Sequence, residues 1–91
     1  MDITELRARI NEINDEMLKL FCERMEVSAK VAEYKKFNNM PVTDAARESE
    51  IYRRVALDAG EMGDYAVRLF ELLISLSKEY QNKLLESGKN E

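Results

Sequence analysis

The sequence lacks most of the residues from which metal sites and nucleophilic catalytic sites are built. Among 91 residues it contains no histidine, no tryptophan and one cysteine, Cys22. Histidine is the commonest metal ligand and general base in proteins, and an internal disulfide needs a second cysteine. The composition therefore excludes an internal disulfide, a cysteine metal site and catalysis by a histidine base, and we expect neither a metal nor another cofactor.

Proline, glycine and long apolar runs are equally scarce. One proline and three glycines leave long stretches without a helix breaker. No apolar run approaches the roughly 20 residues that a membrane-spanning helix needs. Residues 1–5 also lack the basic start and the apolar stretch of a signal peptide. We therefore expect a cytoplasmic protein that has no membrane partner.

Positive charge is limited as well. The 14 lysines and arginines are outnumbered by 18 aspartates and glutamates, the formal net charge is −4, and no basic block occurs. Nucleic acids and anionic membranes bind dense basic surfaces, so neither is an expected partner. Any cation that binds a ligand in this protein must act locally.

What the sequence does contain is helical periodicity over nearly all of a single domain, residues 1–91. We predict an all-α fold of three helices, one long and two shorter, at about residues 4–36, 44–59 and 64–86. Asn38, Asn39 and Pro41 interrupt the first pattern. Residues 61–63 form the second connection, and we expect Asp64 to cap the third helix.

The first predicted helix is too long for a compact monomer. Some 32 residues at about 1.5 Å per residue give a rod of about 48 Å, whereas a compact chain of this size has a diameter of only about 32 Å. We expect a second copy of the chain to cover part of the rod in a twofold homodimer. The apolar stripe along the rod consists of Leu6, Ile10, Ile13, Met17, Leu20, Val27, Val31 and Tyr34.

Arg24 interrupts this stripe at a position where an apolar, buried residue is expected. A guanidinium there either reaches water along its stem or needs an anion. Lys35 lies eleven residues later and within about 20° of the same face. Arg7 lies about 25 Å away along the rod, so it reaches Arg24 only from the other chain of an antiparallel pair. The alternative is that Arg7 is an ordinary surface arginine.

Two further sets of polar residues border apolar helix faces. Asp44, Arg47 and Glu48 share the first turn of the second helix, and Ser77 and Gln81 occupy adjacent turns of the third. An N-cap role explains Asp44, and the helix dipole explains Glu48. Either third-helix residue alone is explained as a satisfied core or edge residue. Together with the two cations of the first helix, these residues predict one cationic cavity, suited to a small dicarboxylate that carries a hydroxyl.

Five segments in this order and spacing resemble the all-helical chorismate mutase family. They are residues 6–7, 24–25, 31–35, 41–48 and 77–81. The resemblance implies an intertwined helical homodimer that converts chorismate to prephenate by a Claisen rearrangement, without a covalent intermediate. Because the chain ends soon after Gln81, we expect a stand-alone form without a fused enzyme domain.

The resemblance also implies roles for individual residues. Arg24 and the partner subunit's Arg7 would bind the two carboxylates of the substrate, assisted by Ser77. Lys35 and Gln81 would donate hydrogen bonds to the ether oxygen as its bond breaks, where negative charge needs fixed donors.

At the other end of the substrate, the resemblance assigns the ring hydroxyl to Glu48 and the backbone near Asp44, with Arg47 in support. Two alternatives stay open. One is an isochorismate pyruvate lyase, which shares the fold and the cationic pocket, although Arg47 with Glu48 and the pair Ser77 and Gln81 favour the mutase. The other is a noncatalytic helical dimer that binds or regulates a synthase of the same pathway, which would not need Lys35.

Overall fold

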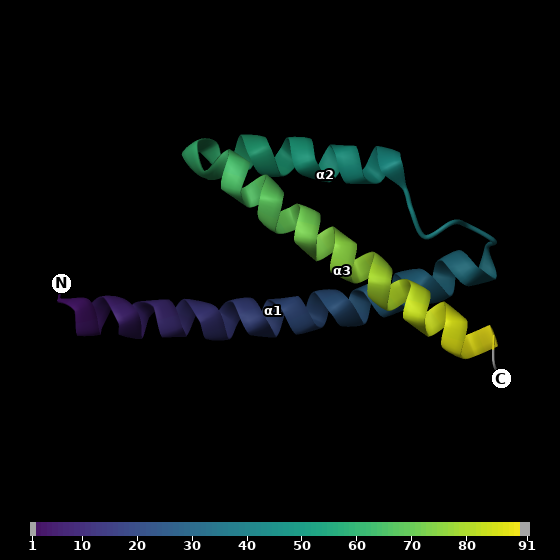
Figure 1. Ribbon diagram of the computed structural model, residues 1–91, viewed down its shortest axis with the longest axis horizontal. Helices are drawn as coiled ribbons and strands as arrows, with labels where there is room; N and C mark the ends of the chain where they lie inside the picture. The colour runs from purple at the N-terminus through teal and green to yellow at the C-terminus, as the bar shows by residue number, and fades with distance from the viewer. Residues whose placement is uncertain (1, 90–91) are drawn as a thin grey trace.

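The computed structural model describes residues 2–89, which form three α-helices and one 3₁₀ turn (Figure 1). The elements are α1 (Ile3–Phe37), α2 (Ala45–Asp58), the 3₁₀ turn η1 (Gly60–Met62) and α3 (Gly63–Lys89). No strand occurs among the described residues. The prediction of an all-α fold is confirmed, and each α-helix begins and ends within three residues of its expected bounds.

Side-chain caps and one left-handed residue set the helix ends. The Asp2 carboxylate accepts a hydrogen bond from the Glu5 backbone amide at 2.9 Å, and the Asp44 carboxylate accepts one from the Arg47 amide at 3.0 Å. Each bond satisfies an amide that has no partner within its own helix. α1 stops before Asn39, whose φ of 55° is left-handed and is tolerated better by asparagine than by most residues.

The corner between α2 and α3 is tighter than the sequence indicated. Gly60 has a φ of 56° and begins η1, so α3 starts at Gly63 and Asp64 lies within its first turn. The expectation that Asp64 caps this helix is therefore wrong. A Cβ atom at Gly63 would lie 2.9 Å from the carbonyl oxygen of Ala56. The lack of a side chain at Gly63 lets α3 begin in close contact with α2.

α3 contacts both of the other helices. It leaves the corner beside α2 and then crosses the C-terminal half of α1 (Figure 1). The N-terminal half of α1 projects beyond this crossing, and no other described helix lies beside it (Figure 1). The radius of gyration is 16.5 Å and the longest extent 55 Å, whereas a compact chain of this length has a radius of gyration of about 12 Å. The single chain is elongated.

This open shape leaves apolar side chains uncovered. Among the described residues, Ala32 and Ile74 are the buried apolar ones. The predicted apolar stripe of α1 is exposed along its length, with Ile10 at 55% and Leu20 at 63%. The expectation of a buried stripe is therefore wrong for one chain taken alone. The face of α1 that is buried carries Ser28 and Ala32 instead.

The chain exposes more surface than a folded monomer of its mass. Its accessible area is 7582 Å², while a compact monomer of the same mass exposes roughly 5,500 Å². The excess of about 2,000 Å² is comparable to the area that one subunit of an obligate dimer buries. None of the described helices is both long enough and apolar enough to cross a membrane.

Candidate active site

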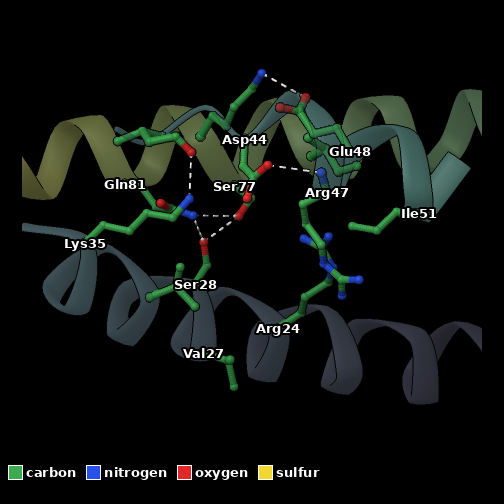
Figure 2. A pocket seen from close by; sticks show the side chains of 14 residues that line it. Arg24, Val27, Ser28, Lys35, Asp44, Arg47, Glu48, Ile51, Ser77 and Gln81 are labelled. Carbon is green, nitrogen blue, oxygen red and sulfur yellow. Dashed lines mark hydrogen bonds and ion pairs between the residues drawn. The ribbon is translucent and has the colours of Figure 1, made fainter. Parts of the chain in front are cut away.

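A cavity of about 290 Å³ lies where the C-terminal half of α1, the start of α2 and α3 meet (Figure 2). Seven of the eight predicted site residues line it. Arg7 does not, because it lies on the exposed N-terminal part of α1. The lining residues are Arg24, Val27, Ser28, Val31, Lys35, Val42, Asp44, Arg47, Glu48, Ile51, Ile74, Ser77, Lys78 and Gln81.

α1 contributes a polar face to the cavity. Arg24, Ser28 and Lys35 follow one another at i, i+4 and i+11, so they share one side of the helix. Ser28 is buried, and the two cations are half-buried. Arg24 Nη1 donates a long hydrogen bond of 3.5 Å to the Leu73 carbonyl oxygen, and Lys35 Nζ donates to the Val42 carbonyl oxygen at 2.7 Å. Backbone carbonyls therefore hold both cations at the cavity.

No carboxylate of residues 2–89 forms a salt bridge with Arg24 or Lys35. A partly buried cation without a counter-ion has lost hydration that an anionic ligand can replace. The guanidinium fork matches a carboxylate, and the ammonium acts as a compact point charge with three donors. These two cations therefore define an anion-binding side of the cavity.

The first turn of α2 forms another wall. The guanidinium of Arg47 pairs with Glu50 at 3.0 Å on the exposed side of the helix. Glu48 instead turns toward α3, where Lys78 Nζ donates to its Oε1 at 3.0 Å (Figure 2). The side chains of Lys78 and Glu48 are 32% and 19% exposed. Their bridge holds a carboxylate at the cavity wall and links α2 to α3.

α3 supplies two polar residues to the most buried part of the cavity. Ser28, Ser77 and Gln81 are 5%, 9% and 6% exposed. Gln81 Nε2 donates to Ser28 Oγ at 2.9 Å and to Ser77 Oγ at 3.3 Å, and the two serine hydroxyls bond to each other (Figure 2). These bonds satisfy polar groups that would otherwise be costly to bury. Gln81 Oε1 is also buried and has no partner among the described residues.

Positive charge dominates this cavity of an acidic protein. Four cationic side chains and two carboxylates line it, although the net charge of the chain is −4. Within residues 2–89, no group of three or more acidic, histidine or cysteine side chains is arranged to hold a metal ion. The donors and cations that are present can bind an anion, orient it and stabilise negative charge that develops in it.

Sequence reasoning missed two of the polar residues in this cavity, Ser28 and Lys78. Ser28 lies four residues after Arg24 and seven before Lys35, so helical spacing alone was enough to place it on their face. Lys78 had no comparable signal. Its bridge to Glu48 depends on how closely α3 approaches α2, and periodicity within one helix carries no information about that distance.

Comparison with known proteins decides the family. The sequence pattern of the family described as Chorismate mutase type II matches residues 6–82. The chain belongs to this family. One relative named chorismate mutase, from Methanocaldococcus jannaschii, is 33% identical over 91 residues, which cover 97% of this chain and 92% of that protein. The chorismate mutase resemblance inferred from five short segments is confirmed.

Two other relatives of this chorismate mutase family member are much longer proteins. The bifunctional chorismate mutase/prephenate dehydratase of Escherichia coli K12 is 33% identical over 88 residues, which cover 93% of this chain and 23% of that protein. The protein of the same name from Buchnera aphidicola subsp. Schizaphis graminum is 31% identical over 94 residues, which cover 99% of this chain and 24% of that protein. The chain thus spans about a quarter of the bifunctional relatives.

Proposed function

We propose that the chain is a single chorismate mutase domain that catalyses the rearrangement of chorismate to prephenate in this cavity. Membership of the chorismate mutase type II family supports the reaction. The observation that carries the proposal is the pair of cations Arg24 and Lys35, which have no salt-bridge partner among residues 2–89 and share one cavity with the buried amide of Gln81. Prephenate is an intermediate in making aromatic amino acids, so we assign the protein to that pathway.

The proposed rearrangement is intramolecular. The ether C–O bond of chorismate breaks while a C–C bond forms in the same molecule, with no covalent bond to the protein. The protein therefore has two tasks: to hold a flexible substrate in a compact reactive shape, and to stabilise the charge that builds on the ether oxygen. A millionfold acceleration needs about 8 kcal/mol, which these two effects can supply together.

We assign the two substrate carboxylates to Arg24 and to the partner subunit's Arg7. Arg24 makes a single long contact with the Leu73 carbonyl oxygen, at 3.5 Å, so most of its guanidinium fork is free for a carboxylate. Ser77 assists with its hydroxyl group. Arg7 of the same chain lies outside the cavity, which is why we assign this role to the second subunit.

We assign the ether oxygen to Lys35 and Gln81. Lys35 Nζ donates to the Val42 carbonyl oxygen at 2.7 Å, which leaves two of its three hydrogens for a ligand. Gln81 adds a neutral amide donor from the opposite helix, α3. Donors fixed in place before the reaction stabilise the developing charge without having to reorganise.

At the ring-hydroxyl end, we assign Glu48 and the backbone near Asp44. Lys78 binds Oε1 of Glu48, so Oε2 is left to accept a hydrogen bond from the hydroxyl. Arg47, whose guanidinium is paired with Glu50 at the exposed edge, supports this end through its positive charge.

We also propose that two copies of the chain form an intertwined homodimer. The stripe of one α1 needs an apolar surface, and a second groove of about 560 Å³ between α2 and α3 offers one, through residues that include Ile51, Val55 and Phe70. Arg24 and Arg47 line both this groove and the first cavity. A partner α1 lying in the groove therefore brings its Arg7 to the substrate site.

The two alternatives receive less support. An isochorismate pyruvate lyase would use the same cationic cavity, but the relatives described above are named as chorismate mutases. A noncatalytic dimer has no use for Lys35 and Gln81 in one cavity. A cytoplasmic location and a pathway synthase as a further partner stay predictions from the sequence.

The decisive experiment is to incubate the purified protein with chorismate, follow the loss of its absorbance and identify the product. We expect prephenate. Lys35→Ala should lower kcat/KM by about 10²–10³, as the removal of a preorganised donor does. Lys36→Ala is the matched control, because Lys36 is the next residue of α1, is exposed and lies outside the cavity lining; its kcat/KM should stay within about twofold.

Three results would contradict this proposal. Release of pyruvate from isochorismate, without prephenate formation from chorismate, would favour the lyase. A folded but inactive wild-type protein would favour the noncatalytic dimer. Equal losses in the two lysine variants would remove Lys35 from its assigned role.

A further inference from the structure

One polar residue of the cavity has no role in the proposed function, namely Ser28. It is 5% exposed, and its Oγ accepts a hydrogen bond from Gln81 Nε2 at 2.9 Å and bonds to Ser77 Oγ (Figure 2). Burying a hydroxyl group costs free energy unless it is hydrogen-bonded. Ala32, one turn later on the same face, is buried without any polar atom in its side chain. This face of α1 therefore accommodates a buried side chain that has no polar atom.

The Gln81 amide is held at one end only. Two serine oxygens lie 2.9 and 3.3 Å from Nε2, whereas Oε1 is buried without a partner in the described chain. A rotation of 180° about the last torsion of a glutamine exchanges its nitrogen and oxygen with little change in shape. A serine hydroxyl can accept from Nε2 or donate to Oε1, so it distinguishes the two orientations only when its hydrogen is used elsewhere. Of the two serines, Ser28 makes the shorter contact with Nε2.

A count of hydrogens shows what the network leaves for a ligand. Gln81 Nε2 carries two hydrogens, and each serine hydroxyl carries one. One hydrogen is used when Nε2 donates to Ser28, and another in the bond between the two serines, where either hydroxyl can be the donor. With Ser28 as that donor, its oxygen can only accept from Gln81. The second Nε2 hydrogen makes only the longer contact of 3.3 Å, and the Ser77 hydrogen is not used within the network. Two donors are therefore available to a ligand that is rich in acceptors.

We infer that Ser28 is a positioning residue that directs these two donors at the substrate. It accepts one hydrogen of Gln81, which fixes the amide with Nε2 toward the serines, and it donates to Ser77. This inference rests on the proposed function, in which Gln81 serves the ether oxygen and Ser77 serves a carboxylate. Without the hydroxyl of Ser28, the amide is free to present Oε1 to the ether oxygen, where two acceptors repel each other.

The test compares Ser28→Ala and Ser28→Cys with Ser75→Ala. Cysteine fills the space of serine with a somewhat larger sulfur atom but hydrogen-bonds weakly, so it separates the loss of packing in Ser28→Ala from the loss of the hydrogen bond. Ser75 is exposed on α3 and lies outside the cavity lining. Both Ser28 variants should lower kcat by about tenfold or more. KM should change less than kcat, because charge on the ether oxygen develops only in the transition state, and Ser75→Ala should leave both unchanged.

A Gln81→Glu background provides a readout that packing alone does not move. A glutamic acid donates only when protonated, so this variant should lose activity as pH rises. The wild type has a neutral amide and should show no such loss. When residue 81 is a carboxylate, the Ser28 hydroxyl can turn from Ser77 to donate to it, and a hydroxyl that donates to a carboxylate favours its ionised form. Adding Ser28→Ala should therefore move the midpoint of the loss upward by roughly half to one pH unit.

The other charged groups around position 81 do not differ between the two variants, so the shift in midpoint isolates Ser28. The charged residues that line the cavity with residue 81 are Arg24, Lys35, Asp44, Arg47, Glu48 and Lys78.

The outcomes separate this inference from the proposed function. A wild type that fails to convert chorismate overturns the proposed function, and the inference with it. An active wild type with unchanged kcat in both Ser28 variants overturns the inference alone. A Ser28→Cys variant with wild-type kcat beside an impaired Ser28→Ala shows a packing role and overturns it too, as does an unmoved midpoint. If circular dichroism shows that Ser28→Ala does not fold, the kcat of Ser28→Cys decides.

Discussion

The two halves of α1 depart from the usual rule for a soluble helix in opposite ways. In residues 3–20 the apolar side chains are exposed and no described helix lies beside them. Between Arg24 and Lys35 a polar side chain, Ser28, is buried, while Val27 and Val31 are exposed. A folded monomer buries its large apolar residues and leaves polar ones in water. Each half therefore lacks a covering group, an apolar surface in the first half and an anion in the second.

This difference fits the proposed dimer, in which one helix serves two sites. The C-terminal half builds the cavity of its own chain, and the N-terminal half is free to complete the cavity of another. Arg7 and Arg24 are far apart in one chain, yet in the proposed dimer they meet at one substrate. If the comparison is correct, changes in the N-terminal half should affect assembly and activity together. Changes in the C-terminal half should affect activity with little effect on assembly.

The largest effect should come from a charge in the exposed stripe. Ile13→Asp places a carboxylate where the second chain must pack, and burying it unpaired costs several kcal/mol. We expect the dimer to dissociate, Tm to fall and chorismate turnover to drop below detection, as measured by analytical ultracentrifugation, circular dichroism and the absorbance assay. Asn14→Asp, which adds the same charge to the next residue and off the stripe, should stay dimeric. A dimeric, active Ile13→Asp protein would show that the stripe is not the interface.

The sequence identified which residues share one face of a helix, but not which part of the molecule covers that face. Spacing placed Arg24 and Lys35 on one side of a helix, and the cavity contains both. The same spacing suggested a buried stripe, but it says which residues share a face and not whether their own chain covers it. The cap of α3 was wrongly assigned to Asp64, because the helix already begins at Gly63, which lies close to Ala56. Contacts between helices, such as Lys78 with Glu48, need a three-dimensional structure.

A smaller but more specific effect should come from Arg7, which tests whether the two halves of α1 serve different sites. Arg7→Ala should reduce kcat/KM by about 10²–10³, the scale of losing one binding cation, with the dimer intact. Mixing Arg7→Ala with Lys35→Ala subunits should restore about a quarter of wild-type activity, because half of the random dimers contain one complete site. The measurement is the rate of chorismate loss before and after subunit exchange.

The matched control for this mixture is Arg24→Ala with Lys35→Ala. Both residues line the cavity of the same chain, so no heterodimer of these two variants contains a complete site, and activity should not return. Exchange must be demonstrated, for instance with subunits of different mass. Recovery in the control, or no recovery in the Arg7 mixture despite exchange, would show that the two halves of α1 do not divide the site as proposed.

The smallest effect should come from the bridge between Lys78 and Glu48. This bridge lines the cavity that the C-terminal half of α1 forms with α2 and α3 of the same chain. Lys78→Met keeps most of the stem and removes the charge. Because the two side chains are 32% and 19% exposed, solvent limits the loss of stability to about 1 kcal/mol or less. We expect KM for chorismate to rise a few-fold, because Glu48 is less well held at the ring hydroxyl, with kcat nearly unchanged. Lys83→Met, an exposed lysine of α3, should change neither. A large fall in kcat for Lys78→Met would mean that this ammonium acts on the reacting atoms themselves.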